Sequence, residues 1–165
     1  MYELPYGFCG MPCALCNKYR ANGISRCKGC SVNGLFTGTC NLHKCCKLKR
    51  NIACATCDEF PCKKYKGLKE FSDLSTDCVW NKNCENISQN GFDEWYKEYK
   101  EKSELLTVAL EQYNNGRIKK YLCELFIRQD LDTLRSIMKE AEKLHGTKKE
   151  LALLFKEIAN KTIIK

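Results

Sequence analysis

Hydrophobic side chains recur at helical spacing in the second part of this chain and follow no clear period in the first. From Phe92 onward, apolar residues return every three or four positions, which is the spacing of an amphipathic helix. Four stretches carry this pattern, over residues 92–113, 118–126, 131–144 and 147–158. The pattern therefore predicts three or four helices that are joined by short loops and packed as an antiparallel helical layer.

Start and stop signals mark the ends of these stretches. Gly116 and Gly146 follow the last apolar positions of two stretches, where glycine commonly ends a helix. Thr147 and Glu150 have the spacing of a capping box, in which each side chain accepts a hydrogen bond from the other residue's backbone amide. We therefore expect the last helix to begin directly after Thr147.

The first 66 residues are crowded with Cys, Lys, Gly and Asn and show little regular pattern. Short helices are expected over residues 12–22 and from Pro61 onward, because proline is well suited to the first position of a helix. Residues 41–50 have no clear period. Residues 72–91 are polar and rich in Asn and Ser, which favours a linker or a surface loop.

These contrasts predict a small α-rich protein with two parts. We expect a cysteine-rich metal-binding module at 1–68, a linker or wrapping loop at 69–91 and a helical domain at 92–165. In this fold, a zinc-knuckle module packs on an antiparallel helical C-terminal part. The sequence contains no strand run beyond what a knuckle hairpin needs, and no internal repeat.

Cysteine is the most informative residue of the first part. Eleven of the 14 cysteines lie between Cys9 and Cys62, and six of them form pairs with two residues between. Each such CxxC pair can supply half of a tetrahedral thiolate site, which is the arrangement typical of structural zinc. A segment of this size buries too little apolar surface to fold alone. The sequence therefore predicts a module built around zinc.

Ten cysteines are candidate metal ligands, and Cys46 and His43 are spares. The ten are Cys9, Cys13, Cys16, Cys27, Cys30, Cys40, Cys45, Cys54, Cys57 and Cys62. The first two CxxC pairs, Cys13/Cys16 and Cys27/Cys30, have the C-x2-C-x10-C-x2-C layout of one zinc site. The third pair, Cys54/Cys57, forms the second site with two of Cys40, Cys45 and Cys62. Two sites are favoured and a third is possible, and three sites would need all twelve candidates.

Iron is the rival metal. Thiolates alone do not distinguish zinc from iron and sulfide, so an electron-transfer iron-sulfur cluster is an alternative cofactor. Cys9, Cys13 and Cys16 also have the C-x3-C-x2-C spacing of radical S-adenosylmethionine enzymes. Those enzymes need a barrel of alternating strands and helices, and this chain is too short and too helical to form one.

Thiol chemistry is a further alternative. His43 lies close in sequence to Cys45 and Cys46, where an imidazole can activate a thiolate. We favour a ligand or surface histidine, because no third residue that would orient it can be identified. Cys123 is interpreted as a packing thiol, and Cys78 and Cys84 as ordinary loop cysteines. No catalytic or cofactor-binding residue is assigned, and an enzyme is the less favoured class.

The charge of the chain is divided unevenly. Residues 1–66 hold 11 Lys/Arg against 3 Asp/Glu, whereas residues 67–165 hold 17 of each, so the formal +8 belongs to the cysteine-rich part. Each zinc on four thiolates carries a net charge of about −2, so two sites would halve the positive charge of this part. We therefore expect the basic residues mainly to neutralise thiolates, which weakens the case for a nucleic-acid partner.

The expected setting is the cytoplasm. The first residues lack the basic and apolar runs of a signal peptide, and no stretch approaches the length of a membrane span. Thiols stay reduced in the cytosol, which favours ligands over disulfides. The partner is unknown, with a protein partner favoured over nucleic acid and no membrane partner expected.

Several cysteine motifs carry a resemblance to a known family. They are CGMPCALC at 9–16, CKGC at 27–30, Cys40 with Cys45, CATCDEFPC at 54–62, NGFDEW at 90–95 and YNNGR at 113–117 followed by Cys123. Together they resemble the small prokaryotic proteins of the domain of unknown function 3795 family. The resemblance implies metal binding and a cytoplasmic setting, but no activity, substrate or catalytic residue. His43 and Cys46 stand where this family more commonly has other residues, so it implies no ligand role for them.

Overall fold

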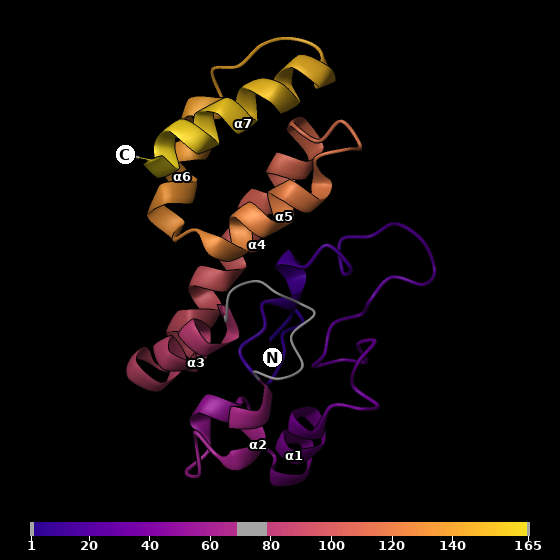
Figure 1. The fold of residues 1–165 in the computed structure, drawn as a ribbon, viewed down its shortest axis with the longest axis vertical. Helices are drawn as coiled ribbons and strands as arrows, with labels where there is room; N and C mark the ends of the chain where they lie inside the picture. Colours follow the sequence, from indigo (N-terminus) through magenta and orange to yellow (C-terminus); the bar gives the residue numbers. More distant parts are fainter. Residues whose placement is uncertain (1, 69–78, 165) are drawn as a thin grey trace. The chain divides into compact units, whose positions relative to one another are not determined.

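The computed structural model describes residues 2–68 and 79–164. Regular structure within these ranges is entirely helical, which confirms the α-rich class. The chain divides into two compact units, Met1–Tyr99 (unit 1) and Lys100–Lys165 (unit 2). Figure 1 follows the chain from the loop-rich indigo and purple segments to the helices in orange and yellow.

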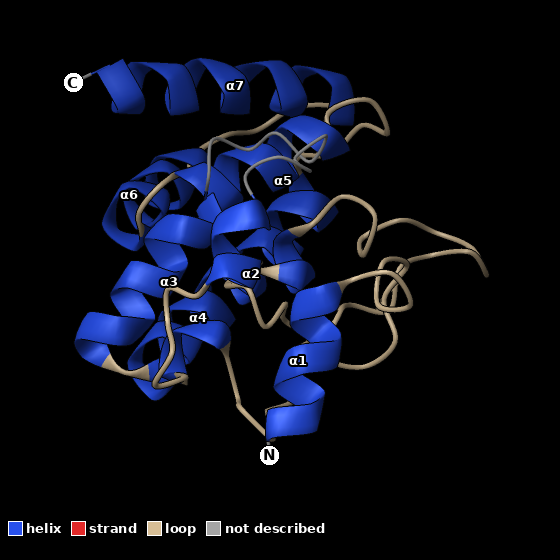
Figure 2. Cartoon of the chain, turned by 60° about the horizontal axis from the view of Figure 1, so that its bottom comes forward, coloured by secondary structure: helices blue, strands red, loops and turns tan. Residues whose placement is uncertain are grey.

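Unit 1 combines short helices with long loops. Its elements are the 3-10 helices η1 (Cys13–Leu15) and η2 (Cys54–Thr56), the α-helices α1 (Asn41–Lys49), α2 (Lys63–Lys66) and α3 (Val79–Asn90), and the first turns of α4 (Phe92–Gln112). Loops, drawn in tan in Figure 2, make up most of the chain before α1. Within the unit, α1 contacts α2 and α3 contacts η2.

The structure corrects one prediction about the first 50 residues and adds a helix that the sequence pattern did not predict. The helix expected over 12–22 is only the single turn η1, because the backbone of Cys16 is already extended, with ψ 136°. The added helix is α1, over residues 41–49. Only Leu42 and Cys46 are buried on α1, so its buried face shows in the sequence only when cysteine is counted as an apolar residue.

The linker or surface loop expected over 69–91 is also corrected. Residues 79–90 form α3, which buries Trp80, Cys84 and Ile87 at helical spacing. Residues 69–78, including Cys78, lie outside the described part of the chain. The boundary between the two units falls inside α4 rather than at residue 92.

An aromatic cluster links the N-terminal segment to the first turns of α4. The ring of Tyr6 lies 4.9 Å from that of Phe92, and Trp95 stacks on Tyr99 at 5.2 Å. The hydroxyl of Tyr99 accepts a hydrogen bond of 2.7 Å from the backbone amide of Ala14. Phe92, Trp95 and Tyr99 are all buried, and they hold the segment that carries Cys9 and the first CxxC pair.

Unit 2 confirms the helices predicted from apolar spacing. Besides the rest of α4, it contains α5 (Lys119–Arg128), α6 (Leu131–Ala141) and α7 (Lys148–Ile164), and α6 packs against α7. Its fully buried side chains include Leu122, Phe126, Leu134, Ile137 and Phe155. The capping box is present, because the Thr147 amide donates to Glu150 Oε2 at 2.8 Å and the Glu150 amide donates to Thr147 Oγ1 at 3.4 Å. None of the described helices is long and apolar enough to cross a membrane.

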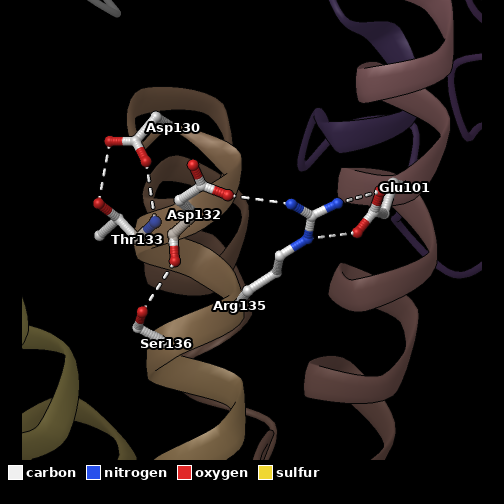
Figure 3. Close-up of polar contacts among 6 residues, drawn as sticks. All are labelled: Glu101, Asp130, Asp132, Thr133, Arg135 and Ser136. Atoms are coloured by element: carbon white, nitrogen blue, oxygen red, sulfur yellow. Dashed lines mark hydrogen bonds and ion pairs between the residues drawn. The ribbon is translucent and has the colours of Figure 1, made fainter.

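Asp130 caps the N-terminus of α6 (Figure 3), where its Oδ1 accepts from the Thr133 amide at 2.8 Å and its Oδ2 from the Thr133 hydroxyl at 2.9 Å. We expect Asp130→Ala to lower the free energy of unfolding by about 1 kcal/mol, as loss of such a cap commonly does. The hydrogen bonds from Thr133 lower the pKa of Asp130. The cap therefore stabilises the fold above the ordinary carboxyl pKa, and this contribution is lost as pH falls through the lowered value.

The matched control is Asp132→Asn in the same turn. Asp132 pairs with Arg135 at 2.9 Å, and Arg135 also binds Glu101 of α4 through two hydrogen bonds of 2.7 and 2.8 Å (Figure 3). Exposed ion pairs contribute little, so we expect a smaller loss. Urea unfolding at neutral and acidic pH measures both variants. Equal losses, or an Asp130→Ala deficit that persists in acid, would contradict the capping role.

Candidate metal centre

Backbone hydrogen bonds hold the cysteine-bearing loops of unit 1 together. The carbonyl of Tyr6 accepts from the Ser31 amide at 2.8 Å, and the Tyr6 amide donates to Ser31 Oγ at 3.1 Å. The carbonyl of Phe8 accepts from the Cys54 amide at 2.6 Å. The N-terminal segment therefore lies between the loop that carries the second CxxC pair and η2, which carries the third.

The first two CxxC pairs meet through Cys13 and Cys30. The Cys30 amide donates to Cys13 Sγ at 3.5 Å. A hydrogen bond between the two thiols raises the pKa of Cys13 and lowers that of Cys30. The other members of these pairs, Cys16 and Cys27, are partly exposed, and Cys27 Sγ accepts from the Gly29 amide at 3.4 Å. One thiol from each pair predicted to share a zinc site is thus beside one from the other pair.

A second thiol contact joins Cys46 of α1 to Cys54 of η2. Their sulfur atoms lie 3.6 Å apart, and the two residues are only 3% and 7% exposed. The hydrogen bond between them raises the pKa of Cys54 and lowers that of Cys46. Cys46, a spare in the sequence prediction, is therefore part of the buried thiol network.

Cys84 and Cys9 border this second contact. Burial raises the pKa of Cys84 to about 11, although hydrogen bonds from the Tyr65 hydroxyl and the Ala55 amide oppose the shift. Cys9 keeps some exposed area, yet its surroundings are dense enough that desolvation raises its pKa to about 12. The thiols of Cys9 and Cys84 both act electrostatically on Cys54. Cys9 and Cys84 are therefore close enough to influence the Cys46–Cys54 pair electrostatically.

His43, a spare ligand in the sequence prediction, lies beside Cys40 and Phe8. Its backbone amide donates to Cys40 Sγ at 3.4 Å, and its ring lies 5.4 Å from that of Phe8. Burial, followed by the charge of Lys47, lowers its pKa, whereas a hydrogen bond to the Cys30 backbone opposes this. Nδ1 is buried and has no hydrogen-bond partner among the described residues. A ligand role for this histidine stays a prediction, since no metal-binding group of three or more side chains is found among the described residues.

Two lysines lie beside partly exposed thiols. Lys64 Nζ donates to Cys45 Sγ at 3.6 Å. A hydrogen bond to Glu59 raises the pKa of Lys49, and the nearby thiols of Cys57 and Cys45 add to the rise. Lysine side chains therefore lie close to cysteine sulfurs of this unit, and their role as neutralisers of thiolates stays a prediction. Cys62, the last candidate ligand, directly precedes α2 as its N-cap residue.

The thiols come together as pairs rather than as complete metal sites. Within residues 2–68 and 79–164, no three His, Cys, Asp or Glu side chains are gathered closely enough to hold a metal ion. Cys123 is buried on α5, as expected for a packing thiol. The metal ligands predicted from the sequence therefore stay a prediction.

The sequence interpretation missed Cys46 and Cys84. Cys46 follows Leu42 by four positions on the buried face of α1, and Cys84 has the same spacing from Trp80 on α3. Helical spacing is the signal that identifies both, provided that cysteine is counted as an apolar residue.

Comparisons with family models, curated proteins and solved structures found nothing that matches this chain. The family resemblance drawn from the cysteine motifs therefore also stays a prediction.

Proposed function

We propose that this is a zinc-binding protein in which structural thiolate sites hold unit 1 together, and that it acts as a binding or regulatory module. The observation that carries the proposal is the meeting of the first two CxxC pairs at Cys13 and Cys30, with a 3.5 Å contact between the Cys30 amide and Cys13 Sγ. Zinc ligands commonly come from two such pairs. No catalytic residue is assigned.

The loops that follow each of the two pairs support the need for a metal. Large apolar side chains in them are exposed, at 105% for Ile24 between the pairs and at 66% for Val32, 59% for Leu35 and 42% for Phe36 between the second pair and α1. Hydrophobic burial therefore contributes little to holding these loops in place. Small segments of this kind are usually held by disulfides or by a metal.

In the proposed first site, Cys13, Cys16, Cys27 and Cys30 bind zinc as thiolates. Four sulfur donors suit the tetrahedral preference of zinc, which would supply a cross-link between the two loops. The Gly29 amide donates to Cys27 Sγ at 3.4 Å, and amide donors commonly accompany the sulfur ligands of metal sites. Since these ligands must stay reduced, we also propose a cytoplasmic setting. The zinc-knuckle architecture of unit 1 and an antiparallel arrangement of the helices belong to the same proposal.

Metal analysis of protein purified without oxygen tests the proposal. We expect a colourless protein with about two zinc ions per chain, and about one in Cys27→Ser. Cys123→Ser, which changes a buried thiol of α5, is the matched control and should keep both. A wild-type protein without zinc would overturn the proposal.

A redox protein is the second candidate function. It is favoured by the 3.6 Å contact between the sulfur atoms of Cys46 and Cys54. Two thiols in contact need to move little to form a disulfide, whose S–S bond is about 2.05 Å long. The same sample separates the candidates: a brown protein with iron and acid-labile sulfide indicates an iron-sulfur cluster, and a metal-free protein that gains a Cys46–Cys54 disulfide on exposure to peroxide indicates thiol redox chemistry.

A further inference from the structure

We propose that Cys9, Cys46, Cys54 and Cys84 form the second zinc site, and that α3 thereby supplies a ligand from outside the cysteine-rich segment. This inference rests on the proposed function and deepens it by naming the ligands of one site. It replaces the sequence-based choice of Cys57 with two of Cys40, Cys45 and Cys62 as the partners of Cys54.

The contact between Cys46 and Cys54 has the dimensions of one edge of a zinc site. Four sulfur atoms at about 2.3 Å from zinc in a tetrahedron lie about 3.8 Å from one another. The observed separation of 3.6 Å is close to that value. Both residues are buried, one on α1 and the other on η2, so this edge links two elements of unit 1.

Hydrogen bonds on both sides hold Cys9 near this edge. The preceding residue, Phe8, accepts from the Cys54 amide at 2.6 Å. The following residue, Gly10, accepts from Asn83 Nδ2 at 2.7 Å. Cys9 is therefore fixed between the segment that carries Cys54 and the helix that carries Cys84.

Cys84 approaches the same place from α3. It is fully buried, and a Cβ atom added to Gly10 would lie 3.1 Å from its Sγ. The Tyr65 hydroxyl, which donates to Asn81 Oδ1 at 2.9 Å, and the Ala55 amide lie beside its sulfur and oppose the rise of its pKa. Polar groups commonly surround the sulfur ligands of metal sites.

Of the four thiols, Cys46 and Cys54 are in direct contact, and no three of the described His, Cys, Asp or Glu side chains are gathered closely enough to hold a metal ion without movement. Cys54 interacts electrostatically with Cys9, Cys46 and Cys84, and Cys84 also interacts with Cys9 and Cys46. Cys9 interacts with Cys30 and Cys40 as well. Zinc binding would draw the sulfur atoms of Cys9 and Cys84 onto the edge formed by the other two. The four thiol protons would be released to solvent, and the bound site would carry a net charge of about −2.

Zinc content distinguishes this ligand set from the alternative. We expect the wild type to hold about two zinc ions and Cys84→Ser and Cys46→Ser to hold about one each. Cys45→Ser and Cys62→Ser should keep both, as should the control Cys123→Ser. The zinc that remains in Cys84→Ser would occupy the Cys13 and Cys30 site, and so it also reports that the variant folds.

The wild-type protein offers a direct second measurement. With cadmium-113 in place of zinc, we expect NMR couplings from the β-protons of Cys9, Cys46, Cys54 and Cys84 to one and the same cadmium ion. A two-metal wild type in which Cys84 couples to neither ion, or in which Cys84→Ser keeps both ions, would overturn the inference. So would a Cys46–Cys54 disulfide in protein purified without oxygen. A wild type that binds no metal would instead overturn the proposed function as a whole.

Discussion

Removal of zinc is expected to unfold unit 1 and to leave the helices of unit 2 folded. Structural zinc contributes on the order of 10 kcal/mol per site, which is comparable to the whole stability of an ordinary domain. The loops after Cys16 and after Cys30 have little buried apolar surface to compensate for that loss, since Ile24 is fully exposed and Val32 is 66% exposed. Unit 2 has its own buried core around Phe126 and Phe155.

The positions of the two tryptophans allow the units to be followed separately. Trp80 and Trp95 are the only tryptophans of the chain, and both are buried in unit 1. With a strong chelator, we expect tryptophan fluorescence and the near-ultraviolet spectrum to become those of unfolded protein. The far-ultraviolet helical signal should fall only in part, because α5, α6, α7 and most of α4 lie in unit 2.

Chelator that has been saturated with zinc beforehand is the control for this experiment, since it should change neither signal. Unchanged tryptophan fluorescence and an unchanged melting curve after complete metal removal would show that zinc does not hold unit 1. A complete loss of the helical signal would show that unit 2 depends on unit 1 for its stability.

Unit 2 was predictable because its helices carry wide apolar faces. On α6, Leu134, Ile137, Met138 and Ala141 are all buried, and they recur at three or four residues. Local signals agree with this pattern, since Asp130 and Thr147 cap the starts of α6 and α7. Where local and long-range preferences coincide, spacing alone is enough to identify the elements.

Unit 1 was harder to predict because cysteines complete the buried faces of its helices. Without Cys46, α1 has a single buried residue, Leu42. Without Cys84, the buried face of α3 has no residue between Trp80 and Ile87. An interpretation that reserves cysteines for metal or assigns them to loops removes the residues that would reveal these helices.

Spacing also limits what can be predicted about the site. Cys13 and Cys30 belong to CxxC pairs whose separation suits one zinc site, and the structure brings these two thiols together. The contact between Cys46 and Cys54 depends on how α1 packs near η2, which no local motif encodes. Cys84 cannot be assigned to the site from motif spacing either, because it lies beyond the cysteine-rich segment.

Gly10→Ala is expected to destabilise unit 1 by about 3 kcal/mol or more. Gly10 has φ +86°, a left-handed conformation that costs an alanine about 1–2 kcal/mol. An added Cβ would also lie 2.7 Å from the carbonyl oxygen of Trp80 and 3.1 Å from Cys84 Sγ. Because the first of these neighbours is backbone, α3 itself would have to shift, and overpacking of this kind adds about 1–3 kcal/mol.

Gly91→Ala is the matched control, because Gly91 has nearly the same φ, +88°, and no atom within 4 Å of an added Cβ. It should show the backbone cost alone. Urea unfolding of the zinc-loaded proteins, followed by tryptophan fluorescence, measures both variants. A shift of α3 would also carry Cys84 away from Cys9, so Gly10→Ala should bind less zinc while Gly91→Ala keeps its full content. Equal destabilisation and equal zinc content in the two variants would show that the close approach of α3 to Gly10 contributes nothing to stability or to the metal site.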